Sequence, residues 1–329
     1  PGVLYELYNG KLCIKNSLNT INTKMKNNKI SEIRNRIKIN LKQYFQNIKK
    51  DYPNYNYVVC LSGGLDSSIV AYYSKRYLNN KNLSFTSFSF TNNLLDDQLD
   101  KQEAVSEDFL IAKKISKKLK IPFIPIKSTM KIDNKTLINI LISAQDYRDF
   151  NIHCATLNYF LGKKLKKRFD PLNTILITGD LMNEFVIDYK EEKVEGKVYY
   201  KLPNIPLDRL RNFLVKGLDT SDRELGVFYN FGFYTVQPYN CVIDQYLSID
   251  SKYLKDEKFK YKMNKHLIPK EIFSLISLKK NRAQSCDKGF GALNLFINSK
   301  ITQKKLIKNF NKIYLDDKSH EIIEFGKYR

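Results

Sequence analysis

The residues best suited to chemistry form one short stretch, Ser62-Gly63-Gly64-Leu65-Asp66-Ser67-Ser68. Its two adjacent glycines permit backbone conformations and close approaches that a side chain would block. Its serine hydroxyls can donate hydrogen bonds, and a helix that begins here would add free N–H groups and a positive dipole end. These features together predict a cradle for an anion the size of a phosphate.

The single aspartate of this stretch changes the expected ligand. Asp66 cannot favour a bare phosphate, so its presence implies a cation, for which Mg²⁺ is the natural choice beside phosphates. The stretch is not the GxxxxGK[ST] P-loop, because no Lys follows the glycines, and it does not match GxGxxG. It indicates chemistry on a nucleotide with its Mg²⁺ ion, and the alternative is a glycine-rich turn without a ligand.

The elements around the stretch predict how it is held. Residues 57–61 form an apolar run rich in strand formers, and residues 69–77 are expected to be helical. Further strands are expected at 84–90, 122–126 and 174–178, and further helices at 107–119, 137–144 and 155–165. Because strands alternate with helices, the sequence predicts an α/β fold with a doubly wound parallel sheet and right-handed crossovers.

The flanking segments predict additions to this sheet. Residues 1–20 are expected to form a hairpin, since Asn9-Gly10 separates two alternating apolar runs, and a helix is expected at 29–50. Helical stretches dominate later in the chain, at 206–218, 238–248, 270–278 and 293–312. We therefore expect three parts: an N-terminal arm and helix at 1–50, a nucleotide-binding α/β core at 51–205, and a helical C-terminal part at 206–329.

The composition is that of a globular protein. The 329 residues include 22 Tyr and 20 Phe, which a disordered chain would lack. No apolar run approaches the ~20 residues of a membrane helix and no signal peptide is visible, so we expect a cytoplasmic protein without a membrane partner. The five cysteines stand far apart without a CxxC pair, and there are only three histidines. These counts argue against a disulfide framework, a zinc site and a histidine-rich metal centre.

The net charge of the chain is strongly positive. Lys and Arg number 56 against 34 Asp and Glu, which gives a formal charge of +22. A charge of this size can mark a protein that binds nucleic acid. Lysine accompanies abundant asparagine and isoleucine along the whole chain, however, and an AT-rich genome would also produce this pattern. Both interpretations stay open, with nucleic acid as the less favoured partner.

The stretch at 62–68 resembles the SGGxDS signature of the PP-loop ATP pyrophosphatases. Those enzymes cleave ATP between its α and β phosphates and leave an adenylated substrate and pyrophosphate. The resemblance implies an α/β fold of the PP-loop type, like that of the adenine nucleotide alpha hydrolases. It also implies that ATP and Mg²⁺ are the cofactors.

A second motif narrows the resemblance to one family. Thr178-Gly179-Asp180-Leu181-Met182-Asn183-Glu184 resembles the SGEGADE motif in the synthetase domain of asparagine synthetases and β-lactam synthetases. Asp180 stands at the family's first Glu, and Asn183 replaces the Asp expected to hold Mg²⁺, whereas Glu184 is retained. An Asn carbonyl can bind Mg²⁺ but brings no charge, so we expect weaker metal binding or a shift of the metal to Asp180. The alternative is a capped helix start.

The family resemblance implies roles for individual residues. The metal ligands would be Asp66, Asn183 and Glu184. Asp180 and Glu184 would assist catalysis, in part by taking up a proton from the amine. Contacts with ATP are implied for Leu61, Ser62, Gly63, Gly64, Asp66, Ser67, Ser68, Ser89, Phe90 and Gly179.

Two further segments extend the resemblance. Ile152-His153-Cys154-Ala155-Thr156 resembles the family's IRAST stretch, which implies substrate contacts for Asn151 and His153. His153 stands where asparagine synthetases use Arg for the substrate, and this departure argues against aspartate as the acceptor; a structural histidine is the alternative. Residues 279–289 resemble the family's KEQFSDG segment, so Lys280, or the lysine before it, would neutralise the charge of the transition state. A solvated basic face is the alternative there.

Taken as a whole, the resemblance predicts an ATP-dependent, AMP-forming carbon–nitrogen ligase. It would adenylate a small-molecule or peptide carboxylate and transfer the acyl group to ammonia or another amine. Residues 1–6 resemble the strand that joins glutaminase and synthetase domains, so we expect either ammonia from a separate glutaminase subunit or a different amine. Two alternatives stay open: a PP-loop enzyme that modifies tRNA, and a degenerate relative without catalysis, which Asn183 suggests.

Overall fold

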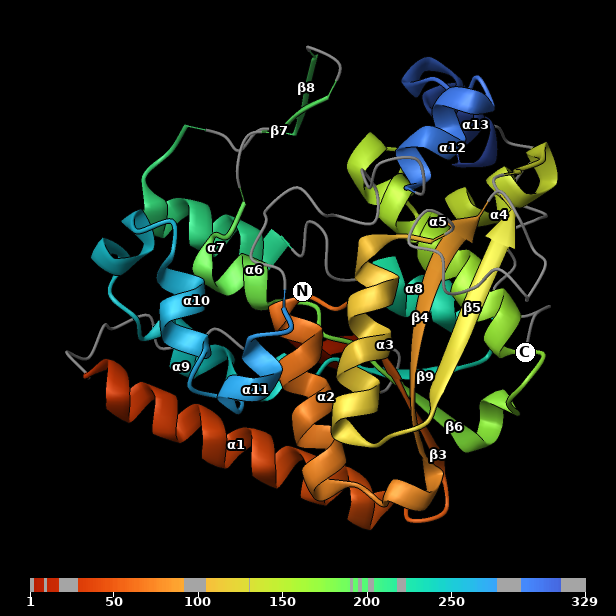
Figure 1. Ribbon diagram of the computed structural model, residues 1–329. Coiled ribbons are helices and arrows are strands. Elements are labelled where there is room, and N and C mark those ends of the chain that lie inside the picture. The colour runs from red at the N-terminus through yellow and green to blue at the C-terminus, as the bar shows by residue number, and fades with distance from the viewer. Residues whose placement is uncertain are drawn as a thin grey trace.

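A five-stranded parallel sheet forms the centre of the computed structural model (Figure 1), with the strand order β5-β4-β3-β6-β9. The structure describes residues 3–8, 11–17, 29–91, 105–129, 131–189, 192–194, 197–200, 204–217, 223–276 and 291–314. The strands are β3 (Asn56–Cys60), β4 (Leu83–Thr91), β5 (Phe123–Thr129), β6 (Thr174–Ile177) and β9 (Tyr234–Val236). Every neighbouring pair is parallel, which confirms the predicted doubly wound α/β fold.

The four predicted strands all exist, and the fifth strand was missed. Strand β9 has only three residues, and Tyr234 at its start is 52% exposed, so it lacks the apolar run that reveals a buried strand. It pairs with β6 at the edge of the sheet. By contrast, all nine residues of β4 are buried, as expected for an inner strand covered on both faces.

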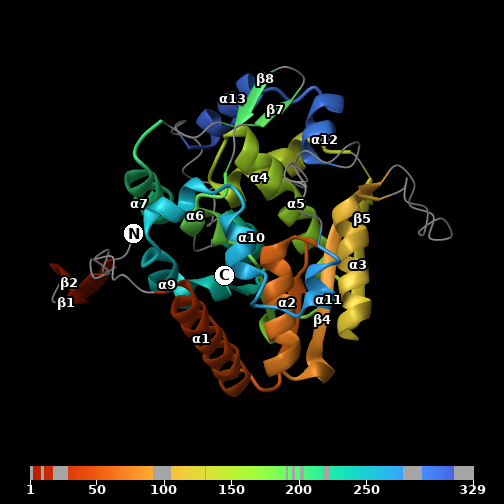
Figure 2. The ribbon, with the colours of Figure 1, turned by 60° about the vertical axis from the view of Figure 1, so that its left-hand side comes forward.

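Helices cover both faces of the sheet (Figures 1 and 2). Alternate residues of β3 point to opposite faces, so Tyr57 and Val59 belong to one buried cluster and Val58 to the other. The first cluster includes side chains from α1 (Ile30–Asp51), α2 (Leu65–Tyr77) and α3 (Glu107–Leu119). The second includes side chains from α4 (Asn134–Ala144), α5 (Asp149–Leu165) and α8 (Arg223–Tyr229).

The C-terminal helices add to both clusters. The first cluster also takes side chains from α9 (Ile243–Leu247), α10 (Phe259–Asn264) and α11 (Lys270–Phe273). The second takes them from α12 (Ala292–Asn298) and α13 (Gln303–Tyr314). The helical stretch expected over 293–312 consists of two helices, because the chain breaks between α12 and α13, where Lys300 has a φ of 52°. The three-part division of the chain stays a prediction.

Four smaller pieces complete the described structure. Strands β1 (Val3–Tyr8) and β2 (Lys11–Ser17) pair antiparallel, as the predicted hairpin requires. Strands β7 (Glu192–Val194) and β8 (Lys197–Tyr200) form a second antiparallel pair that the sequence did not predict. Two short helices, α6 (Met182–Val186) and α7 (Leu207–Gly217), lie in contact with each other. Nowhere in the described ranges is a helix both long and apolar enough to cross a membrane.

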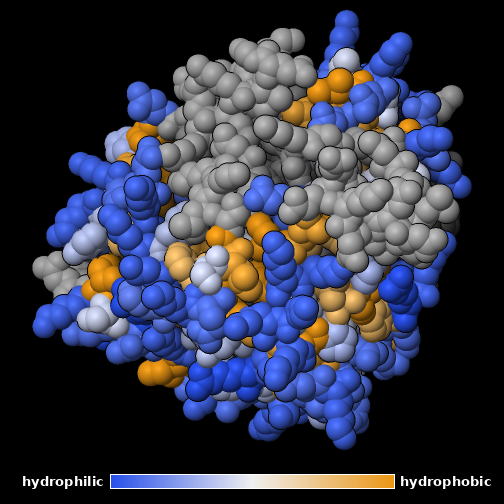
Figure 3. All heavy atoms as spheres, in the orientation of Figure 1, coloured by the Kyte–Doolittle hydropathy of each residue, from blue (hydrophilic) through white to orange (hydrophobic). Residues whose placement is uncertain are grey.

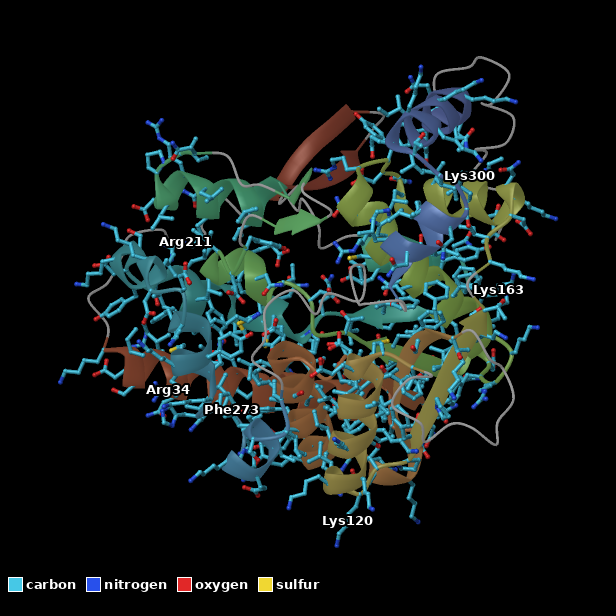
Figure 4. The ribbon with its side chains drawn as sticks, turned by 45° about the horizontal axis from the view of Figure 1, so that its top comes forward. Arg34, Lys120, Lys163, Arg211, Phe273 and Lys300 are labelled. Atoms are coloured by element: carbon cyan, nitrogen blue, oxygen red, sulfur yellow. The ribbon has the colours of Figure 1, made fainter. Side chains whose placement is uncertain are left out.

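Much of the positive charge lies on the outer surface. On the face in Figure 3, hydrophilic side chains dominate and apolar ones form scattered patches. Figure 4 shows Lys120, Lys163 and Lys300 at the periphery, and all three are exposed. A solvated lysine surface agrees with both interpretations of the net charge, so the fold does not decide between them.

Candidate active site

Residues 61–64 join the carboxyl end of β3 to the start of α2, so the loop at 62–68 includes the first turn of this helix. In open parallel sheets, ligands bind beyond the carboxyl ends of the strands, so this loop has the expected location. Gly63 has a φ of +77°, and a Cβ atom there would lie 2.8 Å from the backbone oxygen of Asp108. Only glycine satisfies both the backbone conformation and the close approach of α3.

The serines of the loop hold it through hydrogen bonds of their own. Ser67 Oγ accepts from the Ser62 N–H at 3.1 Å and lies 2.9 Å from Ser62 Oγ. Ser68 Oγ donates to the backbone oxygen of Gly64 at 2.5 Å. Gly64 is the N-cap of α2 and supplies no side-chain cap to the helix. The loop is therefore preformed, and the N-terminus of α2 faces it without a capping side chain, as an anion site requires.

Gly179, which follows β6, lies against the same loop. A Cβ atom on Gly179 would lie 2.6 Å from the backbone nitrogen of Ser67 and 2.7 Å from its Cα. No side chain fits at that distance, so the glycine lets the chain after β6 approach the first turn of α2. The structure thus brings together the two motifs that the sequence singled out, although they are more than a hundred positions apart in the chain.

The other predicted ATP-binding residues are buried. Leu61 and Phe90 are 1% and 0% exposed. Ser89 Oγ accepts from the Ser106 N–H at 2.9 Å and donates to the Phe90 backbone oxygen at 2.7 Å, so its hydroxyl joins the end of β4 to the start of α3. Their role as ATP contacts stays a prediction.

A buried lysine lies beside the loop. Lys260 Nζ, from α10, donates to Asp66 Oδ2 at 2.6 Å and to Asn183 Oδ1, and it lies 3.2 Å from Asp188 Oδ2. The side chains of Lys260, Asp66 and Asp188 are 7%, 19% and 10% exposed. We call these four residues the Lys260 cluster. It joins α2, α6 and α10 at one point.

Burial and charge act in opposite directions on this cluster. Burial raises the pKa of Asp66 to about 6, while the Lys260 ammonium pulls it down and Asp188 and Glu184 push it up. Burial alone would lower the pKa of Lys260, but Asp66 and Asp188 outweigh that effect and raise it. Lys260 is therefore a cation at neutral pH, and Asp66 is ionised in most molecules.

The backbone around α6 is strained on both sides. Leu181, at its N-cap, has a φ of 86°, and Ile187, at its C-cap, has a φ of 51°. Such values are costly for bulky and β-branched residues, and they cluster at functional sites. Between these two residues, α6 carries Asn183 and Glu184, whose side chains the sequence placed at a metal site.

The described residues do not fit a Mg²⁺ ion held by the protein. Asp66 Oδ2 and Asn183 Oδ1 accept hydrogen bonds from Lys260, and Glu184 Oε1 accepts one from the Tyr189 hydroxyl; Asp66 Oδ1 is buried without a hydrogen bond. No group of three or more His, Cys, Asp or Glu that could hold a metal occurs in the described ranges. Asp66 and Asn183 do meet at one point, as the motif comparison implied, but the cation between them is an ammonium. Their role as metal ligands stays a prediction.

A second charged group surrounds Asp180. Burial, together with Glu184, raises the pKa of Asp180, whereas Arg223 acts to lower it. Burial and the charge of Asp180 raise the pKa of Glu224 well above its usual value, against the opposing effect of Arg223. Gln237 Nε2 donates to Glu224 Oε1. We call Asp180, Arg223, Glu224 and Gln237 the Arg223 cluster; its two carboxyl groups retain protons more strongly than free acids do.

The predicted substrate residues line the neighbouring part of α5. Asn151 Oδ1 accepts from Arg223 Nη1 at 3.4 Å, and Asn151 Nδ2 donates to Asp146 Oδ2 at 2.6 Å. His153 is 3% exposed, and its ring centroid lies 4.5 Å from that of Phe296. Burial lowers the pKa of His153 to about 3, so the imidazole is neutral and cannot form the ion pair that an arginine would form with an acid. Their substrate contacts stay predictions.

Lys280 lies outside the described residues, so its predicted role is untested. The residues that sequence reasoning missed are Lys260, Arg223, Glu224 and Gln237. Lys260 stands between Lys258 and Lys262 in a chain with 56 basic residues, so nothing in its sequence context marked it. Only contacts across long sequence separations distinguish it, for example the 194 positions to Asp66.

Comparison with known proteins agrees with this arrangement. Residues 54–209 match the model of the asparagine synthase family, which confirms the predicted resemblance over this part of the chain. The matched part contains the loop at 62–68, Asp180 and the whole of α6. Residues 54–209 are therefore similar to the asparagine synthase family. None of the curated proteins in the comparison matches the chain significantly.

Several solved structures match the chain at low similarity. NMN synthetase from Francisella tularensis is 16% identical with a TM-score of 0.31, and the match covers 78% of this chain and 100% of that one. NH3-dependent NAD synthetase from Campylobacter jejuni is 14% identical (TM-score 0.31; 76% and 92% covered). The U34-tRNA thiolase NcsA from Methanococcus maripaludis is 11% identical (TM-score 0.34; 92% and 86% covered). Likeness at this level carries no information about the substrate.

Proposed function

We propose that this protein is an ATP-dependent amide-forming ligase, which adenylates a substrate carboxylate and transfers the acyl group to ammonia or another amine. The observation that carries the proposal is the preformed loop at 62–68, which lies at the carboxyl edge of the sheet inside the asparagine synthase match. A glycine-rich loop with an open helix N-terminus is suited to polyphosphate. In a synthetase, the polyphosphate that such a loop would bind is that of ATP.

The reaction has two steps. A carboxylate oxygen of the substrate attacks the α-phosphorus of ATP, the α–β bridging bond breaks, and pyrophosphate leaves. The amine nitrogen then attacks the acyl carbon, the bond to the phosphate oxygen breaks, and AMP leaves. The loop would hold the departing phosphates in line through backbone and serine donors, so that positioning supplies much of the acceleration. Lys280 would neutralise charge on the α-phosphate.

The Arg223 cluster is suited to the proton of the second step. An attacking amine must lose a proton, and Asp180 lies directly after Gly179, which contacts the loop. Burial raises the pKa of Asp180, which brings this carboxyl closer to the range in which a general base works at neutral pH. We propose that Asp180 accepts the proton, with Glu224 as its buried neighbour and Glu184 as the alternative base.

The proposed acceptor is an acid other than aspartate. His153 is neutral and buried, so it offers no positive charge for the second carboxylate of an aspartate. The acceptor is then a small-molecule or peptide carboxylate recognised by other groups. The amine is either ammonia from a separate glutaminase subunit or another nucleophile. We place the reaction in the cytoplasm, where ATP is available.

The test is substrate-dependent exchange of labelled pyrophosphate into ATP, over a panel of carboxylic acids plus bulk tRNA. Exchange with one acid, and AMP as the nucleotide product, would support the proposal. Formation of ADP and phosphate, or no binding of ATP at millimolar concentration, would contradict it. Exchange with tRNA alone would indicate that RNA, and not a small acid, is the substrate. The binding of tRNA to the protein should then weaken steeply with salt.

A matched pair of glycines separates a loop effect from a folding effect. Gly63 and Gly232 both have positive φ values, +77° and +87°, but only Gly63 lies in the loop. We expect Gly63→Ala to abolish exchange, because its methyl group would push the loop off α3. Gly232→Ala would strain the backbone to a similar degree, with Pro171 Cβ at 3.4 Å, and exchange should persist.

A further inference from the structure

The Lys260 cluster places an ammonium at the point where the two motifs predicted a metal. Asp66 comes from the SGGxDS-like loop, and Asn183 from the SGEGADE-like motif. Both accept a hydrogen bond from Lys260 Nζ, and Asp188 Oδ2 lies 3.2 Å from the same nitrogen. An ammonium has three donors, so these three oxygens can satisfy it completely. Oxygens of three residues thus surround Lys260 Nζ, as they would surround a bound cation.

The charges of the Lys260 cluster disfavour the binding of a divalent ion. Two carboxylates and one ammonium leave one net negative charge, and Asn183 adds none. A Mg²⁺ ion on the same oxygens would stand in contact range of a buried ammonium, and like charges in a low-dielectric site repel strongly. The family motif has an acid where this chain has Asn183. The neutral side chain of Asn183 suits a site whose cation is the single charge of Lys260.

The position of the lysine is fixed by packing on both sides. On α10, Phe259 and Met263 are 7% and 1% exposed and belong to the first buried cluster. Asn264, at the end of α10, accepts from the Tyr246 hydroxyl at 2.8 Å and donates to Met182 Sδ at 3.3 Å, which ties α10 to α6. The ammonium is held at the cluster by these anchors and by its own ion pairs.

We propose that Lys260 is the built-in cation of the phosphate site, in place of a Mg²⁺ ion held by protein side chains. It is a positioning residue, because it neutralises Asp66 and Asp188 and so makes the loop beside them acceptable to polyphosphate. Metal would then reach the site only as part of the nucleotide. The inference rests on the proposed function for the identity of the ligand, but its central claim concerns the nucleotide-free protein.

The test titrates metal into the nucleotide-free full chain. Mn²⁺ is followed by the loss of its free paramagnetic resonance signal, and Mg²⁺ by calorimetry. We expect no saturable binding to the wild-type chain in the millimolar range. For Lys260→Met, which removes the ammonium from Asp66 and Asp188, we expect affinity for the metal to rise by about tenfold or more, since a repelling charge is removed and two attracting charges are left.

Two controls separate this role from a structural one. Lys262, two residues away on α10, pairs with Asp256 at 2.6 Å but is 61% exposed, and Lys262→Met should bind metal no better than the wild type. The double variant Asp66→Asn, Lys260→Met also removes one of these two acids, and the gained affinity should fall again. A merely structural lysine would give no gain of metal affinity and no such reversal.

The inference is overturned if the wild-type chain binds Mg²⁺ or Mn²⁺ saturably without nucleotide and loses this binding in Asp66→Asn. It is also overturned if folded Lys260→Met binds metal no better than the wild type. Should Lys260→Met fail to fold, Lys260→Gln, which keeps two hydrogen-bond donors without the charge, takes its place. Because none of these samples contains nucleotide, failure of the ligase proposal would leave the result unaffected.

Discussion

Lys260 and Arg223 each lie near two carboxyl groups and one carboxamide at the carboxyl edge of the sheet. In the Lys260 cluster the base contacts the acid directly, with Nζ 2.6 Å from Asp66 Oδ2, and the pKa of Asp66 rises only to about 6. In the Arg223 cluster burial raises the pKa of both carboxyl groups, and Asp180 adds to the effect on Glu224, whose pKa rises well above its usual value. The two clusters thus contain similar side chains, but their carboxyl groups differ in how strongly they hold a proton.

The difference shows how placement of charge decides what a buried acid can do. An ammonium in contact with a carboxylate keeps it ionised near neutral pH, so the Lys260 cluster behaves as a fixed set of charges. Two neighbouring acids share their protons, so the Arg223 cluster is suited to proton transfer. We therefore propose charge neutralisation as the role of the Lys260 cluster and base catalysis as the role of the Arg223 cluster.

The largest effect should come from breaking the fixed charges. Lys260→Met leaves two buried carboxylates without their cation, and we expect the free energy of unfolding to fall by about 3–5 kcal/mol, the usual cost of breaking a buried ion pair from one side. Urea unfolding at pH 7 measures it. The control is Lys262→Met, whose pair with Asp256 is exposed and should cost no more than about 1 kcal/mol. Equal costs for the two variants would mean that the Lys260 ion pairs contribute no more than a surface pair.

The fold was more readily predicted than these clusters. The helix at 107–119 was placed to the residue, because Ser106 caps it, with its hydroxyl accepting from the Phe109 N–H at 3.2 Å, and its apolar positions have helical spacing. Strand β9 was missed because three residues at a sheet edge carry no periodic signal. Local pattern predicts elements that are long enough to show a period.

The site was predictable only where a motif is contiguous. The loop at 62–68 and the stretch at 178–184 are continuous in the sequence, and the structure brings them together through Gly179 and Ser67. Lys260 reaches Asp66 across 194 positions and Asn183 across 77, and Gln237 reaches Glu224 across 13. Such contacts are made by tertiary packing, which one sequence without relatives does not reveal.

A second, intermediate effect concerns the burial of a histidine. Burial lowers the pKa of His153 to about 3, whereas acids reverse the same effect at Lys260. The native state binds the proton less well than the unfolded state, whose pKa is about 6.5, so stability is full above pH 6.5 and is lost as the pH falls toward 3. Between pH 7 and pH 5 we expect the wild type to lose about 2 kcal/mol relative to His153→Leu.

Urea unfolding of both proteins at the two pH values measures this difference, which cancels the pH dependence of the other groups. The exposed His266 is the control, and His266→Leu should show a much smaller pH-dependent difference from the wild type. An equal pH response of the wild type and His153→Leu would show that the imidazole is charged in the folded protein. His153 would then be able to pair with an acid, and aspartate would return as a candidate acceptor.

The smallest effect should come from replacing Glu224 by the amide that resembles its protonated form. Burial and Asp180 raise the pKa of Glu224 well above its usual value and so favour the neutral carboxyl, whose shape Glu224→Gln keeps. We expect a loss of no more than about 1 kcal/mol in the free energy of unfolding, since the oxygen that accepts from Gln237 can be kept.

Asp66→Asn is the matched change in the other cluster, and it should cost more than Glu224→Gln, because it removes a charge that the Lys260 ammonium contacts. The comparison is sharpest at pH 7, where the two acids are expected to differ in ionisation. If Glu224→Gln cost as much as Asp66→Asn, Glu224 would be ionised against Arg223. The two clusters would then be fixed charge sets of the same kind, and the proton of the attacking amine would need an acceptor elsewhere in the site.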